Sequence, residues 1–181
     1  MAKLISSTYA NALFELAIEK NKTDEWQEEI QALKGILEEN PKFGQLMVHP
    51  NVSKEDRMKL AMEAFEGKAD PEIVGLIRII IEKDRYTEID AILDDFINQV
   101  KEHNGVGVAY VNTATELSDT QKKAVEEKLL ATTDYKSMEM HYSVDPAIIG
   151  GMVIRIGDRV VDSSISSKLE GLKKSLLQAQ V

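Results

Sequence analysis

The chain has 181 residues, enough to bury a sizeable core as one domain or as two small ones. Its composition is ordinary for a soluble globular protein, with 43% hydrophobic and 29% charged residues, but its formal net charge of -9 repels a phosphate backbone and excludes nucleic acid as an expected partner. It contains no cysteine, which excludes disulfides, cysteine-ligated zinc and thiol catalysis.

The first 105 residues predict six successive helices. In each segment apolar residues recur at three- and four-residue spacing, and polar residues, proline or glycine separate the segments. Ser6 or Ser7 is the expected cap of the first helix. Asn40 and Pro41 end the second helix and start a short third one, because proline is tolerated in a helix only in its first turn.

The last three of these helices have clear boundary signals. Ser53, followed three residues later by Asp56, resembles a capping box and predicts the start of the fourth helix. Asp70 before Pro71 opens the fifth helix. The sixth helix is expected to stop near Gly105.

The fifth helix is apolar around so much of its circumference that we expect it in the middle of a bundle. Residues 76–81 are the most apolar stretch of the chain, but Arg78 interrupts them, and no run approaches the eighteen or so apolar residues of a membrane span. The first residues lack the unbroken apolar region of a signal peptide. We therefore expect no direct membrane insertion, only attachment through partners.

Beyond residue 105 the hydrophobic period changes from helical spacing to the alternation of strands. Two short strands flank Gly157 and Asp158, a spacing that predicts a tight hairpin. The expected strands are 106–112, 138–144, 152–156 and 159–161, and the expected helices are 118–130 and one that begins near residue 165. The predicted fold class is α+β: an acidic six-helix bundle, residues 1–105, and a nearly neutral α/β domain of order β-α-β-β-β-α, residues 106–181.

Residues 145–164 raise the question of catalysis, because they combine adjacent glycines, three aspartates and paired serines. A phosphate-binding loop would place its glycines after a strand and at the start of a helix, whereas Gly150 and Gly151 precede a strand. Ser163 or Ser164 is expected to cap the final helix, since the sequence does not match G-x-S-x-G. A structural role is therefore predicted for five residues of this stretch: Gly150, Gly151, Gly157, Asp158 and Asp162.

No catalytic residue, cofactor-binding residue or metal ligand is predicted. His49, His103 and His141 are the only histidines and fall on three separate elements, so a zinc site would lack ligands at a suitable spacing. Adjacent carboxylates such as Asp94 and Asp95 point in different directions on a helix and suit a solvated face. A small-molecule enzyme that uses the acidic patch as a metal site remains an alternative hypothesis.

Five segments of the chain carry a resemblance to a known family. They are residues 9–17 (YANALFELA), the lone Trp26, residues 76–85 (LIRIIIEKDR), residues 144–164 (VDPAIIGGMVIRIGDRVVDSS) and residues 168–172 (KLEGL). In this order and spacing they resemble the delta subunit of rotary ATP synthases, whose mitochondrial counterpart is the oligomycin-sensitivity-conferring protein. The fourth segment is the specific part. Where the family often has Asp-Gly-Ser, this chain has Asp162, Ser163 and Ser164, and serine caps a helix at least as well as glycine.

The resemblance implies a mechanical function without chemistry. In this family the helical domain sits on the catalytic head and binds the N-terminal helices of the alpha subunits. The C-terminal domain holds the C-terminal region of the b-subunit stalk, so that the head does not turn with the rotor. A non-catalytic stator subunit of a proton- or sodium-translocating ATP synthase, without a cofactor, is therefore expected at the cytoplasmic face of a bacterial cell membrane. A helical adaptor of a different membrane-associated assembly is the alternative.

The first and fifth helices offer candidate residues for the alpha-subunit site. The first helix has one apolar stripe more than its own core needs, and part of the fifth helix falls away from its main apolar face. Burial of the first helix on two sides would explain its pattern equally well, and the resemblance, which places the partner helix between these two helices, favours a groove. The expected groove residues are Tyr9, Ala12, Leu16, Gly75, Arg78 and Ile79.

Overall fold

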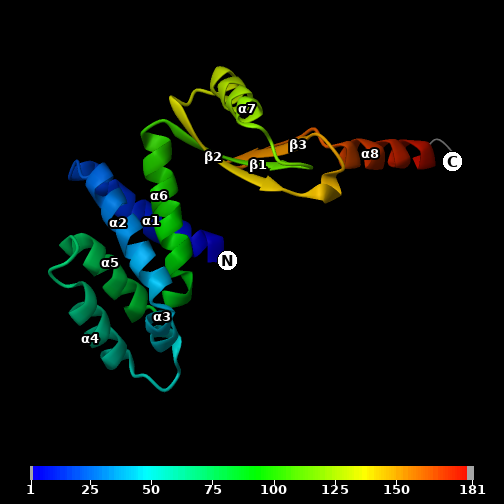
Figure 1. Ribbon diagram of the computed structural model, residues 1–181. Helices are drawn as coiled ribbons and strands as arrows, with labels where there is room; N and C mark the ends of the chain where they lie inside the picture. Colours follow the sequence, from blue (N-terminus) through cyan, green and yellow to red (C-terminus); the bar gives the residue numbers. More distant parts are fainter. Residues whose placement is uncertain (1, 179–181) are drawn as a thin grey trace. The chain divides into compact units, whose positions relative to one another are not determined.

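The computed structural model describes residues 2–178, with side chains from Ser6 to Leu177. The chain divides into two compact units, Met1–Val100 and Lys101–Val181. The first is helical and the second contains a four-stranded sheet, so the fold class is α+β (Figure 1). The division falls inside helix α6 (Ile89–His103), a few residues before the boundary predicted at Gly105.

Two helices of unit 1, the fourth and the fifth, begin at the capping residues that the sequence predicts. The helices are α1 (Ala2–Glu19), α2 (Thr23–Glu39), α3 (Pro41–Val48), α4 (Lys54–Phe65), α5 (Pro71–Glu82) and α6, with a 3-10 turn, η1 (Tyr86–Glu88), before α6. The Ser53 hydroxyl accepts the Asp56 backbone N–H at 3.1 Å, and the Asp70 carboxylate accepts the Glu72 backbone N–H at 3.1 Å. These side chains satisfy N–H groups that the first turns of α4 and α5 leave without a helical partner.

The predicted start of the first helix at Ser6 or Ser7 is wrong. α1 begins at Ala2, so both serines lie inside the helix. Ser6 is buried, and its hydroxyl donates to the Asp95 carboxylate of α6 at 2.6 Å. A hydrogen bond between helices thus satisfies a hydroxyl whose sequence position resembles a cap.

Among the described side chains, the core of unit 1 is a single cluster of 22 buried hydrophobic residues drawn from all six helices and η1. Trp26 and Phe96 are its largest fully buried side chains. α5 buries six of its 12 residues, as expected for the most apolar helix of the chain: Ile73, Val74, Leu76, Ile77, Ile80 and Ile81.

Unit 2 is built on a mixed sheet in the order β2-β1-β3-β4. Its elements are β1 (Val106–Thr113), α7 (Asp119–Thr132), β2 (Ser137–Val144), the 3-10 turn η2 (Pro146–Ile148), β3 (Met152–Ile156), β4 (Arg159–Asp162) and α8 (Ile165–Gln178). β1 pairs in parallel with β2 through the α7 crossover, and antiparallel with β3. The predicted hairpin is confirmed: β3 and β4 pair antiparallel around Gly157, whose φ is 55°.

One face of this sheet packs under α7. Ala109, Val111 and Thr113 of β1 point to it and are buried, as is Val125 of α7. The Tyr142 hydroxyl of β2 donates to the Lys122 carbonyl of α7 at 3.1 Å. The residues that alternate with them lie on the opposite face of the sheet, which is more exposed.

The glycines before β3 allow two segments to approach closely. A Cβ added at Gly151, where φ is 79°, would lie 2.5 Å from the Ser163 carbonyl oxygen, and one at Gly150 would lie 2.7 Å from the Ile165 side chain. The Ile165 backbone N–H donates to the Gly150 carbonyl at 2.9 Å. Gly150 and Gly151 therefore allow the start of β3 to pack directly against the start of α8.

Candidate protein-docking site

The two apolar stripes of α1 differ in burial. Ala10, Leu13 and Ala17 are buried in the core of unit 1. On the other stripe, Ala12 is exposed, while Tyr9 and Leu16 are half-buried against the core. The second stripe therefore keeps apolar surface in contact with solvent, as a docking groove requires. Ile5, which extends this stripe in the sequence, lies outside the described side chains.

α5 packs against α1 and presents a similar mixture of small and apolar residues. Gly75 is half-buried, Arg78 is exposed, and the Ile79 side chain is 45% exposed although the helix around it is mostly core. A Cβ added at Gly75 would meet no atom within 4 Å, so the space above this glycine is open. A glycine in a helix interior lowers the stability of the helix by roughly 1 kcal/mol relative to alanine. The packing of unit 1 would accept an alanine at this position, so it does not explain the glycine.

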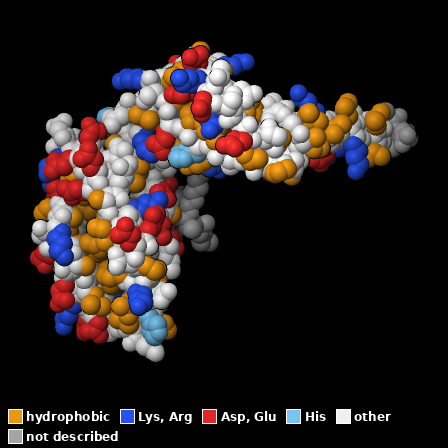
Figure 2. All heavy atoms as spheres, in the orientation of Figure 1, with side chains coloured by type: hydrophobic (Ala, Val, Ile, Leu, Met, Phe, Trp, Pro, Cys, Tyr) orange, Lys and Arg blue, Asp and Glu red, His pale blue; other side chains and the backbone are white. Residues whose placement is uncertain are grey.

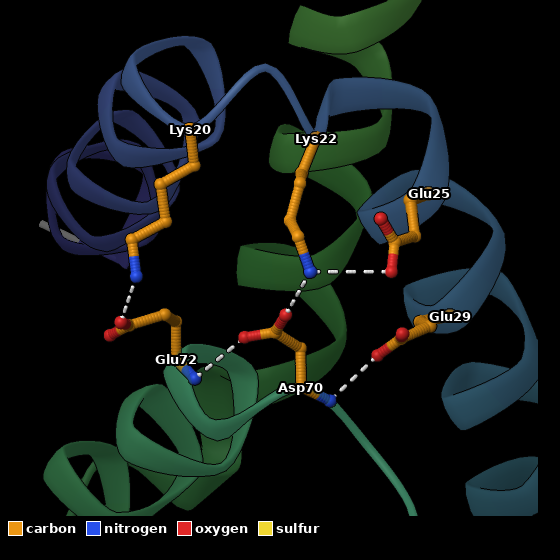
Figure 3. Close-up of polar contacts among 6 residues, drawn as sticks. All are labelled: Lys20, Lys22, Glu25, Glu29, Asp70 and Glu72. Carbon is orange, nitrogen blue, oxygen red and sulfur yellow. Dashed lines mark hydrogen bonds and ion pairs between the residues drawn. The ribbon is translucent and has the colours of Figure 1, made fainter.

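A polar network joins the end of α1 to the start of α5 (Figure 3). Lys20, just after α1, forms an ion pair with Glu72 in the first turn of α5. Lys22 contacts two carboxylates, Asp70 at 2.9 Å and Glu25 at 3.3 Å. The loop between α1 and α2 is therefore attached to the N-terminal end of α5 by side chains from both sides.

Asp70 is the centre of this network. Its backbone N–H donates to the Glu29 carboxylate at 2.8 Å, and its own carboxylate accepts from Lys22 and from the Glu72 backbone. Burial of the carboxylate acts to raise the pKa of Asp70, but these hydrogen bonds outweigh it and hold the pKa below its ordinary value. The Lys22 ammonium responds in the opposite sense, because its hydrogen bond to Asp70 raises its pKa.

Trp26 lies beside the same carboxylate. The indole is fully buried, and its Nε1–H makes no hydrogen bond of standard geometry with any described residue. It is nevertheless close enough to favour the charged form of Asp70. Trp26 therefore reports on the end of the α1/α5 pair where the polar network lies.

Unit 1 has a second apolar surface that the hydrophobic periodicity of the sequence did not predict. A hollow of about 430 Å³ lies between α2, α3 and α4. Ala32, Ile36, Phe43 and Phe65 are among its lining residues, and Lys68 also lines it. No sequence signal identified this hollow, since the same residues satisfy the pattern of ordinary core positions.

Unit 2 leaves apolar side chains of two elements, α8 and β4, uncovered. Leu169, Leu172 and Leu176 of α8 recur at helical spacing and are 52%, 62% and 68% exposed, and Val160 and Val161 of β4 are exposed as well. Figure 2 shows hydrophobic side chains along the length of α8. The sequence predicted this helix and its apolar stripe, but the stripe contacts no core within the described residues of the chain.

Asp162, for which the sequence predicts a structural role, is the last residue of β4 and contacts the start of α8. The Asp162 carboxylate accepts from the Ser164 backbone at 2.8 Å and from the Ser167 hydroxyl at 2.6 Å, and the hydrogen bond from the Ser167 hydroxyl, followed by those from Ser164, lowers the pKa of Asp162. Ser164 in turn accepts the Ser167 backbone N–H at 3.2 Å, which makes it the cap of α8. Between residues 2 and 178 no cluster of three potential metal ligands is found, and no helix is long and apolar enough to cross a bilayer.

Comparison with known proteins decides the family. The family model for the ATP synthase delta (OSCP) subunit matches residues 5–176. The chain belongs to this family. ATP synthase subunit delta of Lachnoclostridium phytofermentans is 46% identical over 181 residues, the full length of both chains, and that of Acetivibrio thermocellus is 30% identical over 97% of this chain and 99% of its own.

A solved structure supports the fold of this delta-family chain. A chain in the cryo-EM structure of the Toxoplasma gondii mitochondrial ATP synthase hexamer matches with a TM-score of 0.79 at 19% identity, covering 95% of this chain and 97% of that chain. Family membership makes the protein a structural, non-catalytic subunit of an ATP synthase. It decides against an adaptor of another assembly and against a small-molecule enzyme.

Proposed function

We propose that the protein links the catalytic head of a bacterial ATP synthase to its peripheral stalk at the cytoplasmic face of the cell membrane. Unit 1, a six-helix bundle, binds the N-terminal helix of an alpha subunit between α1 and α5. Unit 2 binds the C-terminal region of the b subunit through α8. The observation that carries this proposal is that each unit keeps apolar residues exposed on its candidate helices, Ala12 and Ile79 in unit 1 and Leu169, Leu172 and Leu176 in unit 2.

The alpha-subunit site is supported by the shape and polarity of the α1/α5 pair. Ala12 and Gly75 are small, so a helix backbone can approach closely, and Ile79 supplies apolar area for its contact face. Arg78 is exposed beside them and suits a carboxylate on the partner helix. The ion pair between Lys20 and Glu72 fixes one end of the groove, which limits the ordering cost of binding.

The b-subunit site is supported by the exposed stripe of α8. Residues at spacing i, i+3, i+4 and i+7 along one face are the pattern that packs against a second helix. Leu169, Leu172 and Leu176 follow this spacing, and none of the three is buried in unit 2. Covering such a stripe with a partner helix would remove the apolar area that the isolated chain leaves in water.

A titration with a synthetic peptide tests the first site, the peptide being the N-terminal helix of the alpha subunit. Isothermal calorimetry and Trp26 emission on the full chain are expected to show saturable binding at one-to-one stoichiometry. Ala12→Asp should abolish binding, because it places a carboxylate against the apolar face of the partner. Far-UV circular dichroism should stay unchanged, since Ala12 is exposed.

Ala32→Asp is the matched control, because Ala32 is an exposed helix residue that lines the hollow between α2, α3 and α4. It should leave the affinity within twofold of the unmodified chain. If Ala32→Asp abolished binding and Ala12→Asp did not, the partner helix would occupy that hollow and the α1/α5 assignment would be wrong.

The second site is tested with a peptide from the C-terminal region of the stalk-forming b subunit. Leu172→Asp should remove its binding without changing the fold, because the Leu172 side chain is already exposed. Lys174→Asp is the control, because it adds a carboxylate to α8 about 200° around the helix axis from Leu172. It should weaken binding of the peptide much less. Equal effects of the two substitutions would show that the peptide responds to charge on α8 rather than to its apolar stripe.

A further inference from the structure

The sheet face opposite α7 carries an aromatic and cationic cluster that the proposed function does not use. Tyr110 of β1 lies at its centre and is 43% exposed. His141 of β2 and Arg155 of β3 are the direct cross-strand neighbours of Tyr110, and both are exposed. Val160 of β4 is the cross-strand neighbour of Arg155 and is 59% exposed. We refer to Tyr110, His141, Arg155 and Val160 as the stacked surface.

The rings and the guanidinium of this surface hold one another in place. The Tyr110 and His141 rings are stacked with centroids 5.0 Å apart and an interplanar angle of 18°. The Arg155 Cζ atom lies 4.9 Å from the Tyr110 ring centroid, within cation–π range. Arg155 is therefore ordered by an aromatic contact that leaves its N–H groups available to a further partner.

The carboxylates on this face are already engaged. Glu139 lies 2.6 Å from the Lys101 ammonium and 2.9 Å from His141 Nε2. The hydrogen bond from Lys101 is the main reason that the pKa of Glu139 is lowered. Asp162 is held at the start of α8 by backbone and hydroxyl donors.

Arg155 has no such partner. Among the described residues no carboxylate lies within ion-pair distance of its guanidinium. The face therefore presents a pre-ordered guanidinium whose charge no neighbouring side chain neutralises.

We propose that the stacked surface binds an acidic segment of a partner chain, with a carboxylate paired to the Arg155 guanidinium and apolar atoms against Tyr110 and Val160. Planar guanidinium groups bind carboxylates through two parallel hydrogen bonds, which favours a carboxylate over a point anion. Tyrosine and arginine are also among the residue types enriched where binding energy concentrates in protein interfaces. This surface is distinct from the α8 stripe, so the inference goes beyond the proposed function.

A nucleic acid fits this surface less well than an acidic protein segment. Stacking of bases on an aromatic ring would require a basic groove that follows the phosphate backbone. Arg155 is the only arginine or lysine among the strand positions on this face, so the face offers no such groove. A single guanidinium beside apolar and aromatic groups suits an isolated carboxylate.

Nuclear magnetic resonance on the full, ¹⁵N-labelled chain tests the proposal with hexaglutamate as the probe. Saturable shifts are expected at the Arg155 Nε–Hε signal and at the backbone signals of Tyr110 and His141. Arg155→Gln should weaken the affinity about tenfold, as loss of a charge-assisted hydrogen-bond pair predicts, and Arg155→Lys should weaken it by a smaller factor.

Arg159→Gln is the matched control, because Arg159 is an exposed arginine of the same hairpin whose side chain lies on the opposite face of the sheet. It should change the affinity by less than twofold. The proposal is overturned if the stacked surface shows no shifts, or if Arg159→Gln weakens binding as much as Arg155→Gln. If inorganic phosphate or hexathymidylate shifted the same signals with an affinity equal to that of hexaglutamate, the assignment to an acidic protein segment would be overturned.

Discussion

The two units of this delta-family protein differ most in how much apolar surface they bury for themselves. Counting only residues that the structure describes, unit 1 places 22 hydrophobic residues in one buried cluster, whereas unit 2 buries five: Ala109, Val111, Val125, Met138 and Ile148. Most of the large hydrophobic side chains that remain exposed belong to unit 2. Unit 1 therefore has a core sufficient for its own stability, and the stability of unit 2 is expected to depend more on a partner.

This difference follows from what surrounds each apolar stripe. α5 is apolar on most of its circumference and has neighbours on several sides, so its stripe becomes core. α8 carries a stripe of the same spacing, but its described contacts with the rest of unit 2 lie at its N-terminal end, with η2, with Gly150 before β3 and with Asp162 of β4. Periodicity identifies which face of a helix is apolar, while tertiary packing decides whether that face is buried or offered to a partner.

The largest predicted effect falls on the joint that holds α8 to the sheet. Gly151→Asp should destabilise unit 2 by about 3–5 kcal/mol, because a side chain is strained at φ 79° and its Cβ would clash with the Ser163 carbonyl. Gly171→Asp in α8 is the control, since a Cβ there meets no atom within 4 Å. Thermal unfolding followed by circular dichroism should show loss of the unit 2 signal with unit 1 unchanged, and an equal effect of both substitutions would contradict the account.

A smaller effect is expected from the polar network of unit 1. Asp70→Asn keeps an acceptor for the Glu72 backbone but removes the charge that pairs with Lys22, and it should lower the unfolding midpoint of unit 1 by a few degrees at pH 7. Because the pKa of Asp70 is lowered in the folded state, its contribution is present above the ordinary carboxyl pKa of about 3.9 and is lost as pH falls through the folded value.

The difference in midpoint between the unmodified chain and the Asp70→Asn variant should therefore be full at pH 7 and shrink below about pH 4. Thermal unfolding at a series of pH values measures it. A difference that stays constant down to pH 3 would mean that the charge of Asp70 does not stabilise unit 1.

The smallest predicted effect is that of Gly75→Ala, which should change the stability of unit 1 and its affinity for the alpha-subunit peptide in opposite directions. Gly75→Ala should stabilise α5 by about 1 kcal/mol and weaken binding of the alpha-subunit peptide, because the new methyl group enters the open space of the groove. Gly35→Ala in α2 also meets open space and should stabilise to a similar degree without changing the affinity. Equal affinity in both variants would show that the partner helix does not pass over Gly75.

Local signals in the sequence predicted most of the elements of both units. Ser53 and Asp70 cap the helices that they were expected to start, and Gly157 lies in the predicted hairpin. These features depend on neighbouring residues alone, which is why they can be identified without tertiary information. The prediction that Ser6 caps the first helix was wrong because the partner of Ser6 is not a neighbour in sequence. Its hydroxyl donates to Asp95, 89 positions away in the chain.

The candidate site was predictable only in part. The two stripes of α1 are visible in the sequence, but which stripe stays exposed depends on the packing of α1 against other helices. The hollow between α2, α3 and α4 and the stacked surface on the sheet depend on strand register and helix packing, which no single segment encodes. Binding of the proposed partners to the α1/α5 groove and to α8 stays a prediction for experiment.

Differential scanning calorimetry of the full chain, with and without peptides of the two proposed partners, tests the contrast between the units most directly. The free chain is expected to unfold in two transitions, with unit 2 at the lower temperature because it buries the smaller core. The b-subunit peptide should raise only the lower transition, and the alpha-subunit peptide only the upper one, each by mass action on the unit that it binds. A single transition, or a b-subunit peptide that raises the upper transition alone, would contradict a self-sufficient unit 1 joined to a partner-dependent unit 2.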